Sequence, residues 1–199
     1  MIEPPSKNPS LQDAAEWVIR ALKDEDFPIL FCGRAALDYQ GEYTGSVDID
    51  VLIGTDFRGA LSVLDAYVDR GDLFPAGAVP GAAVVEYLVS GLKPVDVMNA
   101  SSIHPDVFDR LRRNASRPIR MGSAGTVHLV THEGYFVLAI MIGLRGFARD
   151  KKDPMLKVRE AWALFGQRTD RAKVNRLLKR LGAKTTLEET LQPPTSDTR

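Results

Sequence analysis

The sequence predicts an α+β fold, in which a mixed sheet with helices is followed by a C-terminal helical part. Two observations support this prediction. Over residues 10–130, short apolar runs of strand length alternate with segments that have the 3.6-residue periodicity of amphipathic helices. Over residues 131–184 only the helical periodicity recurs. Residues 185–199 are polar and proline-containing, which predicts a flexible tail.

The predicted elements follow in a clear order. Ser10 and Asp13 resemble a capping box, so a first helix is expected to begin at Leu11. Gly71 and Pro75 are expected to end the helix that precedes them. The expected strands are 29–32, 47–53, a hairpin of 83–89 and 94–98, and a short strand at 126–130. The expected helices are 11–23, 57–69, 106–114, 133–144, 156–165 and 172–181.

The composition is that of a globular protein rather than of a membrane or disulfide-stabilised one. The chain has 199 residues, of which 44% are hydrophobic and 26% charged. Its longest apolar run, residues 135–144, is about half of the roughly 20 residues that a membrane-spanning helix needs. The N-terminus lacks the pattern of a signal peptide, and the single cysteine, Cys32, excludes an intrachain disulfide. We therefore expect a cytoplasmic protein with no membrane partner.

The charge is zero overall but is unevenly distributed along the chain. Residues 1–144 contain 12 basic and 19 acidic residues, whereas residues 145–184 contain 13 basic and 4 acidic ones. An acidic first part and a basic second part fit a cation site beside a surface for a polyanion such as RNA. Solvated helix faces explain the same pattern equally well.

The most informative motif is a pair of acids in an otherwise apolar strand. Asp48 and Asp50 are two residues apart in the run from Ser46 to Ile53, so both side chains project from one face. Their mutual repulsion would be relieved by a hard divalent cation, which takes carboxylate oxygens and leaves positions open for phosphates. A structural ion pair, or the metal site of a nucleotide-sugar glycosyltransferase, would use the same pattern.

Three features in order resemble the nucleotidyltransferase superfamily that includes DNA polymerase β. Gly33-Arg34 follows the first strand, Asp48 and Asp50 lie on the next, and Asp96 lies in a third apolar strand. The run Ala35-Ala36-Leu37 and the long loop before Ser46 look most like the small bacterial branch related to abortive-infection toxins.

The resemblance implies a function and a set of site residues. Asp48, Asp50 and Asp96 would be the catalytic and metal-binding residues, holding Mg²⁺ or Mn²⁺. Gly33, Arg34 and Ser46 would bind the nucleotide. The reaction implied is transfer of a nucleoside monophosphate from an NTP such as ATP to an acceptor hydroxyl. The acceptor favoured is RNA such as tRNA, ahead of a protein or a small molecule. The branch further implies a toxin, with an antitoxin protein as its partner.

Two residues depart from the pattern of this superfamily. Arg34 occupies the position where relatives have a second small residue, and Ile140 stands where a helical lysine is expected. Arg34 either grips the phosphates or obstructs them. A catalytically silent module with the same fold, which binds a nucleotide or a partner, is therefore the alternative function.

Overall fold

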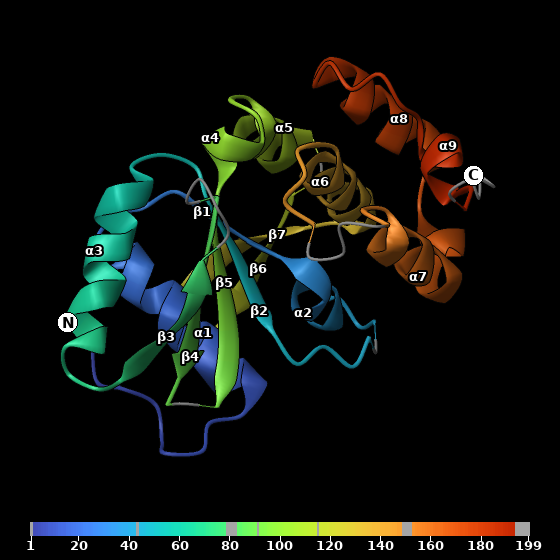
Figure 1. Ribbon diagram of the computed structural model, residues 1–199. Coiled ribbons are helices and arrows are strands. Elements are labelled where there is room, and N and C mark those ends of the chain that lie inside the picture. The colour runs from blue at the N-terminus through green and yellow to red at the C-terminus, as the bar shows by residue number, and fades with distance from the viewer. Residues whose placement is uncertain are drawn as a thin grey trace, which may run out of the picture. The chain divides into compact units, whose positions relative to one another are not determined.

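The computed structural model describes residues 2–42, 44–78, 83–90, 92–114, 116–148 and 153–193. The chain divides into two compact units, residues 1–131 and residues 132–199. The first unit contains the sheet and its covering helices, and the second is helical (Figure 1).

The first unit is built on one seven-stranded sheet with the strand order β3-β4-β5-β2-β1-β7-β6. The strands are β1 (Ile29–Cys32), β2 (Ile49–Ile53), β3 (Leu73–Ala78), β4 (Val84–Val89), β5 (Lys93–Asn99), β6 (Ser116–Met121) and β7 (Gly125–Val130). The pairs β1–β7 and β2–β5 are parallel, and the remaining pairs are antiparallel. This mixed sheet with helices confirms the predicted α+β fold class.

Helices α1 and α3 cover one face of the sheet, opposite the face that carries Asp50. Ser10 caps α1 in a capping box with Asp13, as predicted. The Tyr87 hydroxyl of β4 donates a hydrogen bond to Asp65 of α3, so α3 lies on the face to which Tyr87 points. The helices of this unit are α1 (Leu11–Lys23), α2 (Gly33–Asp38), α3 (Phe57–Val68), α4 (Ala100–Ile103), α5 (Val107–Asn114) and the 3₁₀ turn η1 (Gly122–Ala124).

Both edge strands, β3 and β6, were missing from the sequence prediction. Pro75, expected to end the preceding helix, lies inside β3, and Pro118 lies inside β6. Proline cannot donate a ladder hydrogen bond, so it argues against a central strand but is tolerated at the edge of a sheet. Pro75 and Pro118 therefore explain why the sequence does not predict these two strands. The same prolines protect both edges of the sheet from pairing with another chain. The predicted strand at 47–53 begins only at Ile49.

The second unit consists of helices packed on an aromatic cluster. Its helices are α6 (His132–Leu144), α7 (Leu156–Phe165), the 3₁₀ turn η2 (Gly166–Arg168), α8 (Arg171–Arg180) and α9 (Leu187–Leu191). Phe136 of α6 contacts both Trp162 and Phe165 of α7. The segment expected as a flexible tail contains α9, whose capping box joins Thr186 and Glu189; residues 194–199 lie outside the described part. None of the described helices has the length and apolar character needed to cross a membrane.

Candidate active site

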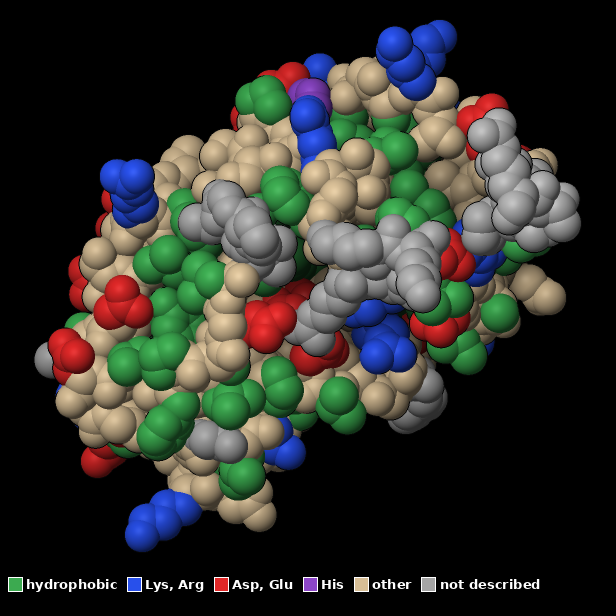
Figure 2. Space-filling model, in the orientation of Figure 1, with side chains coloured by type: hydrophobic (Ala, Val, Ile, Leu, Met, Phe, Trp, Pro, Cys, Tyr) green, Lys and Arg blue, Asp and Glu red, His purple; other side chains and the backbone are tan. Residues whose placement is uncertain are grey.

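Strand pairing brings two of the three predicted acids together. Asp50 of β2 pairs in register with Asp96 of the parallel neighbour β5. Residues in register point to the same face of a sheet, so the two side chains lie next to each other although they are far apart in sequence. Asp96 is only 8% exposed, whereas Asp50 is half-buried. Figure 2 shows acidic side chains gathered near the middle of this view, where Figure 1 places β2 and β5.

The same row of the sheet contains two further functional groups. Cys32 of β1 pairs with Asp50 on one side, and Glu86 of β4 pairs with Asp96 on the other. Glu86 is not among the site residues that the sequence predicts. The hairpin predicted for 83–89 and 94–98 brings the two strands together, but only the observed register of β4 with β5 places Glu86 opposite Asp96.

Asp48, the third predicted acid, lies just before β2 rather than inside it. It is two residues from Asp50 and half-buried. Its carboxylate oxygen Oδ1 accepts a hydrogen bond of 2.9 Å from the Ser46 hydroxyl. That hydroxyl also lies 3.1 Å from the Asp48 carbonyl oxygen. Ser46, predicted to contact a phosphate, thus holds Asp48 in this structure.

Gly33, the first residue of α2, lies against the Asp50 carboxylate. Its φ of +68° is in the left-handed region, which a residue with a side chain adopts only at a cost. A Cβ atom built on Gly33 would lie 1.8 Å from Asp50 Oδ2, far inside any contact distance. Glycine is therefore required here twice, for its backbone conformation and for the space that Asp50 occupies.

A fifth acid, Asp38, holds the loop that leads to Asp48. Asp38 is the last residue of α2, and its Oδ1 accepts a hydrogen bond of 2.6 Å from the Thr44 amide. Its Oδ2 lies 3.4 Å from the Ser46 amide. Asp38 is not predictable from the sequence, because only the folded loop shows which groups its carboxylate contacts.

The carboxylates of Asp48, Asp50 and Asp96 are not arranged around one metal position in this structure. Within the described residues, no three His, Cys, Asp or Glu side chains are close enough together to hold a metal ion as they stand. Asp48 is turned to Ser46, and Asp50 is turned to Gly33. The set of donors nevertheless fits a hard divalent cation, which prefers carboxylate oxygens.

The two departures from the superfamily pattern occupy different environments. Arg34, the second residue of α2, is half-buried, and its side chain forms no hydrogen bond or ion pair with the described residues. Ile140 is fully buried within α6 of the second unit. Ile140 is thus a core residue of the second unit, whereas the N–H groups of the Arg34 guanidinium are available to bind a ligand.

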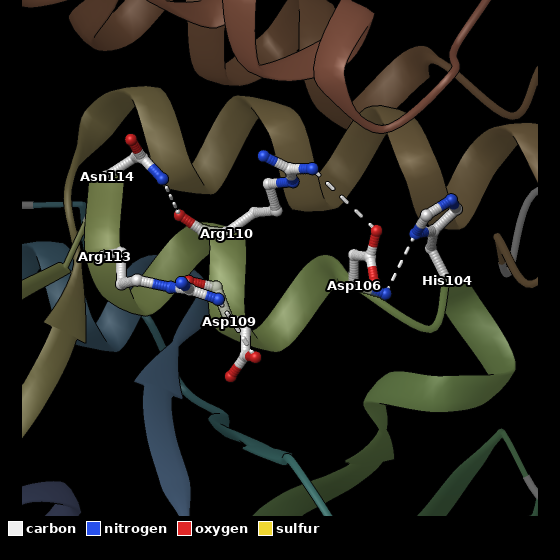
Figure 3. A network of polar contacts seen from close by, with 6 residues as sticks. All are labelled: His104, Asp106, Asp109, Arg110, Arg113 and Asn114. Atoms are coloured by element: carbon white, nitrogen blue, oxygen red, sulfur yellow. Dashed lines mark hydrogen bonds and ion pairs between the residues drawn. The ribbon is translucent and has the colours of Figure 1, made fainter.

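Five arginines form a cluster in α5 and β6, namely Arg110, Arg112, Arg113, Arg117 and Arg120, and two of them pair with acids just before α5 or in its first turn. Asp106 pairs with Arg110 at 4.0 Å, and Asp109 pairs with Arg113 at 3.2 Å, both across one helical turn (Figure 3). The three remaining arginines of the cluster are exposed and form no ion pair with the described residues: Arg112, Arg117 and Arg120.

The thiol of Cys32 is buried next to the carboxylates of the site, and they affect its pKa. Cys32 is fully buried, and its Sγ lies 3.3 Å from the Asp50 carbonyl oxygen. Burial raises the pKa of the Cys32 thiol well above its usual value, and the charges of Asp50 and Asp96 raise this pKa further. Both carboxylates therefore act on the same small region at the end of β1.

This raised pKa predicts a loss of stability in alkali. The unfolded thiol ionises near pH 9, whereas the folded thiol keeps its proton, so the unfolded state binds fewer protons at higher pH. Above pH 9 the free energy of unfolding should fall by about 1.4 kcal/mol per pH unit more in the native protein than in Cys32→Ala. Urea denaturation of both proteins at pH 7.5 and pH 10 measures this difference. If the free energy of unfolding fell equally in the two proteins between pH 7.5 and pH 10, the prediction would be contradicted.

Comparison with known proteins identifies the fold. No protein-family model matches the chain, and no curated protein matches it. An antigenic nucleotidyltransferase-like protein from Paracoccidioides brasiliensis is similar in structure, with a TM-score of 0.50, 14% identity and 91% of each chain covered. The antibiotic-resistance factor ANT(2'')-Ia in solution has a TM-score of 0.52 at 15% identity, covering 84% of this chain and 88% of that one. Its crystal structure in complex with adenylyl-2''-tobramycin has the same TM-score and identity, covering 84% and 94%.

Proposed function

We propose, from the nucleotidyltransferase fold that this chain has, that it is a metal-dependent nucleotidyltransferase. It would move a nucleoside monophosphate from an NTP to an acceptor hydroxyl. The observation that carries the proposal is the register of Asp50 with Asp96, beside a glycine whose missing side chain leaves room for Asp50. Asp48, two residues before Asp50, completes the set of three carboxylates that the sequence resemblance implies.

The proposed reaction is one displacement at phosphorus. The acceptor oxygen forms a bond to the α-phosphorus, and the bond from that phosphorus to the oxygen bridging to the β-phosphate breaks, releasing pyrophosphate. The hydroxyl proton passes to a carboxylate, a role that we assign to Asp96. Asp96 is suited to it because it lies between Asp50 and Glu86 in the row of acids across β2, β5 and β4, and because its burial limits competition from water.

Asp48, Asp50 and Asp96 would hold Mg²⁺ or Mn²⁺. When bound, the cation neutralises the phosphate charge and orients the attacking and leaving oxygens. For all three carboxylates to bind one cation, at least one side chain has to rotate. Asp48 can offer its second oxygen, Oδ2, to the cation while Oδ1 keeps the hydrogen bond from Ser46. Side-chain rotations of this kind are ordinary, because staggered rotamers interconvert without backbone movement.

We propose RNA such as tRNA as the acceptor. Arg112 of α5 and Arg117 and Arg120 of β6 support this choice, because they are exposed and are not neutralised by described acids. Arginine is well suited to phosphate groups, since its planar guanidinium donates several hydrogen bonds at once. The toxin role implied by the resemblance is part of the same proposal, with an antitoxin as the partner.

The direct test is transfer of label from nucleotide to acceptor. Purified protein, Mg²⁺ and α-³²P-labelled NTPs are incubated with total RNA, with protein extract and with small hydroxylated compounds. The expected result is label on RNA that EDTA prevents. Label on a small compound alone would support the nucleotidyltransferase activity but overturn RNA as the acceptor. No label on any acceptor would overturn the proposal.

Arg34 provides a separate prediction about the nucleotide. We expect its unpaired guanidinium to bind the phosphates, because a charged hydrogen bond of this kind contributes about 1.5–3 kcal/mol. Arg34→Ala should therefore raise the KM for NTP by about 10-fold. Arg58→Ala, which removes an exposed arginine from α3, is the matched control and should leave KM unchanged. A lower KM in Arg34→Ala would show instead that Arg34 obstructs the site.

A catalytically silent module remains the second candidate function. It is favoured by one observation, namely that the described acids do not converge on a metal position. Calorimetry separates the two candidates when it is combined with the label assay. A nucleotide sensor binds NTP without turnover, and a pure interaction protein binds neither NTP nor Mn²⁺.

A further inference from the structure

One carboxylate of α2, that of Asp38, contacts two backbone amides of the loop before β2. Asp38 accepts the Thr44 amide on one oxygen at 2.6 Å, and its other oxygen lies 3.4 Å from the Ser46 amide. Gly45, between them, has a φ of +65°, and this left-handed bend lets two alternate amides face one side chain. The Thr44 hydroxyl adds a second link to α2 through the Arg34 carbonyl oxygen, at 3.3 Å.

A second hydrogen bond continues from this loop to the candidate metal site. The Ser46 amide faces Asp38, and the Ser46 hydroxyl lies 2.9 Å from Asp48 Oδ1. Two steps therefore connect Asp38 to Asp48, one through a backbone amide and one through a hydroxyl. The orientation of the Asp48 carboxylate depends on where this loop holds Ser46.

Helix stability does not account for an acid at the position of Asp38. A carboxylate at the C-terminal end of a helix faces the negative end of the helix dipole. Other aspartates of this chain, such as Asp13, Asp56 and Asp170, accept amides at helix N-termini, where the dipole favours them. Asp38 breaks that rule and stabilises the loop instead. Such local conflicts are expected where a residue serves a functional site.

We infer that Asp38 is a positioning residue for the proposed reaction. By holding the Thr44 and Ser46 amides, it fixes the Ser46 hydroxyl on Asp48 and so sets the orientation of a metal-binding carboxylate. The role in the reaction rests on the proposed function, whereas the link from Asp38 to Asp48 can be measured without metal or nucleotide. Residues that orient metal ligands typically affect metal affinity or activity by about 10- to 100-fold when they are replaced.

The link itself is tested by carbon-13 NMR of the metal-free protein. Asp38→Asn keeps the shape of the side chain but replaces one accepting oxygen with a donor. We expect the Asp48 carboxyl carbon signal to move in Asp38→Asn in the same direction as in Ser46→Ala. Asp56→Asn is the matched control, because Asp56 also accepts a backbone amide, that of Gly59 at 3.0 Å, but lies at the start of α3. An Asp48 signal that moves in Ser46→Ala but not in Asp38→Asn would overturn the inference.

The functional consequence is tested by Mn²⁺ binding, measured by electron paramagnetic resonance. The dissociation constant should rise about 10-fold in Asp38→Asn and not in Asp56→Asn. The double variant Asp38→Asn, Ser46→Ala should be no weaker than Ser46→Ala alone, since both changes break one chain of contacts. Additive losses, or an unchanged dissociation constant, would overturn the positioning role.

These measurements separate failure of the inference from failure of the proposed function. If the native protein binds no Mn²⁺ and labels no acceptor, the proposed function is wrong, and the positioning role in the reaction falls with it. The NMR comparison still decides whether Asp38 orients Asp48. If Asp38→Asn does not fold, Asp38→Glu is the second variant, because it keeps the charge and displaces the accepting oxygens by one methylene.

Discussion

Replacement of Asp48 and Asp50 by asparagine together should reduce nucleotidyl transfer by about 10³-fold or more. The physical reason is the loss of two ligands for a cation whose stabilisation of the transition state contributes several kcal/mol. The fold should tolerate the change, because asparagine keeps the shape of aspartate and one accepting oxygen. In EDTA, the free energy of unfolding should stay within about 1 kcal/mol of the native value. Label transfer and urea denaturation measure the two effects separately.

The chain offers a close control for this double variant. Asp24 and Asp26 are also two residues apart and are exposed after α1, so replacing both with asparagine makes the same change in charge before β1, whose opposite end carries Cys32. This control should keep full activity. Equal activity in the two double variants would remove Asp48 and Asp50 from the reaction.

Gly33→Ala is the second change with a large expected effect. A side chain at a left-handed φ costs about 1–2 kcal/mol, and the new methyl group would also collide with the Asp50 carboxylate. The protein should therefore lose about 2 kcal/mol of stability or more, and Mn²⁺ affinity should fall because Asp50 is displaced. Urea denaturation and Mn²⁺ titration measure both losses.

Gly71→Ala separates the two causes of that loss. Gly71 has a φ of +78°, but a Cβ built there meets nothing within 4 Å. It should show the cost of the backbone conformation alone and bind Mn²⁺ normally. If Gly33→Ala were no worse than Gly71→Ala in both measurements, the contact between Gly33 and Asp50 would have no energetic importance.

Much of this architecture is predictable from the sequence because local signals agree with the fold. The capping box at Ser10 and the helical periodicity that follows it predict α1 with its observed bounds. The apolar run at 29–32 likewise predicts β1. The edge strands β3 and β6 escape prediction because Pro75 and Pro118 carry the signal of a turn, and only neighbouring strands show that they lie at an edge.

The candidate site also contains residues that the sequence predicts and residues that only the structure identifies. Asp48, Asp50 and Asp96 can be selected from the sequence because carboxylates are unusual in apolar strands. Glu86 requires the register of β4 with β5, which places it opposite Asp96. Asp38 requires the folded loop, because nothing in its sequence neighbourhood specifies that its carboxylate will accept two alternate amides. Residues such as Glu86 and Asp38, whose role depends on which other residues they contact, can therefore be identified only from the structure.

The parallel pairing of β2 with β5 also has a consequence for how the chain folds. Asp50 and Asp96 are 46 residues apart in sequence and meet only when these two strands align. Such long-range parallel pairing is slow to form, because the entropy of the intervening chain is lost before the contacts are gained. An unfolded chain would offer a cation only scattered carboxylates. A cation that binds only the native arrangement would therefore raise the melting temperature, by an amount that grows with the logarithm of its concentration above the dissociation constant.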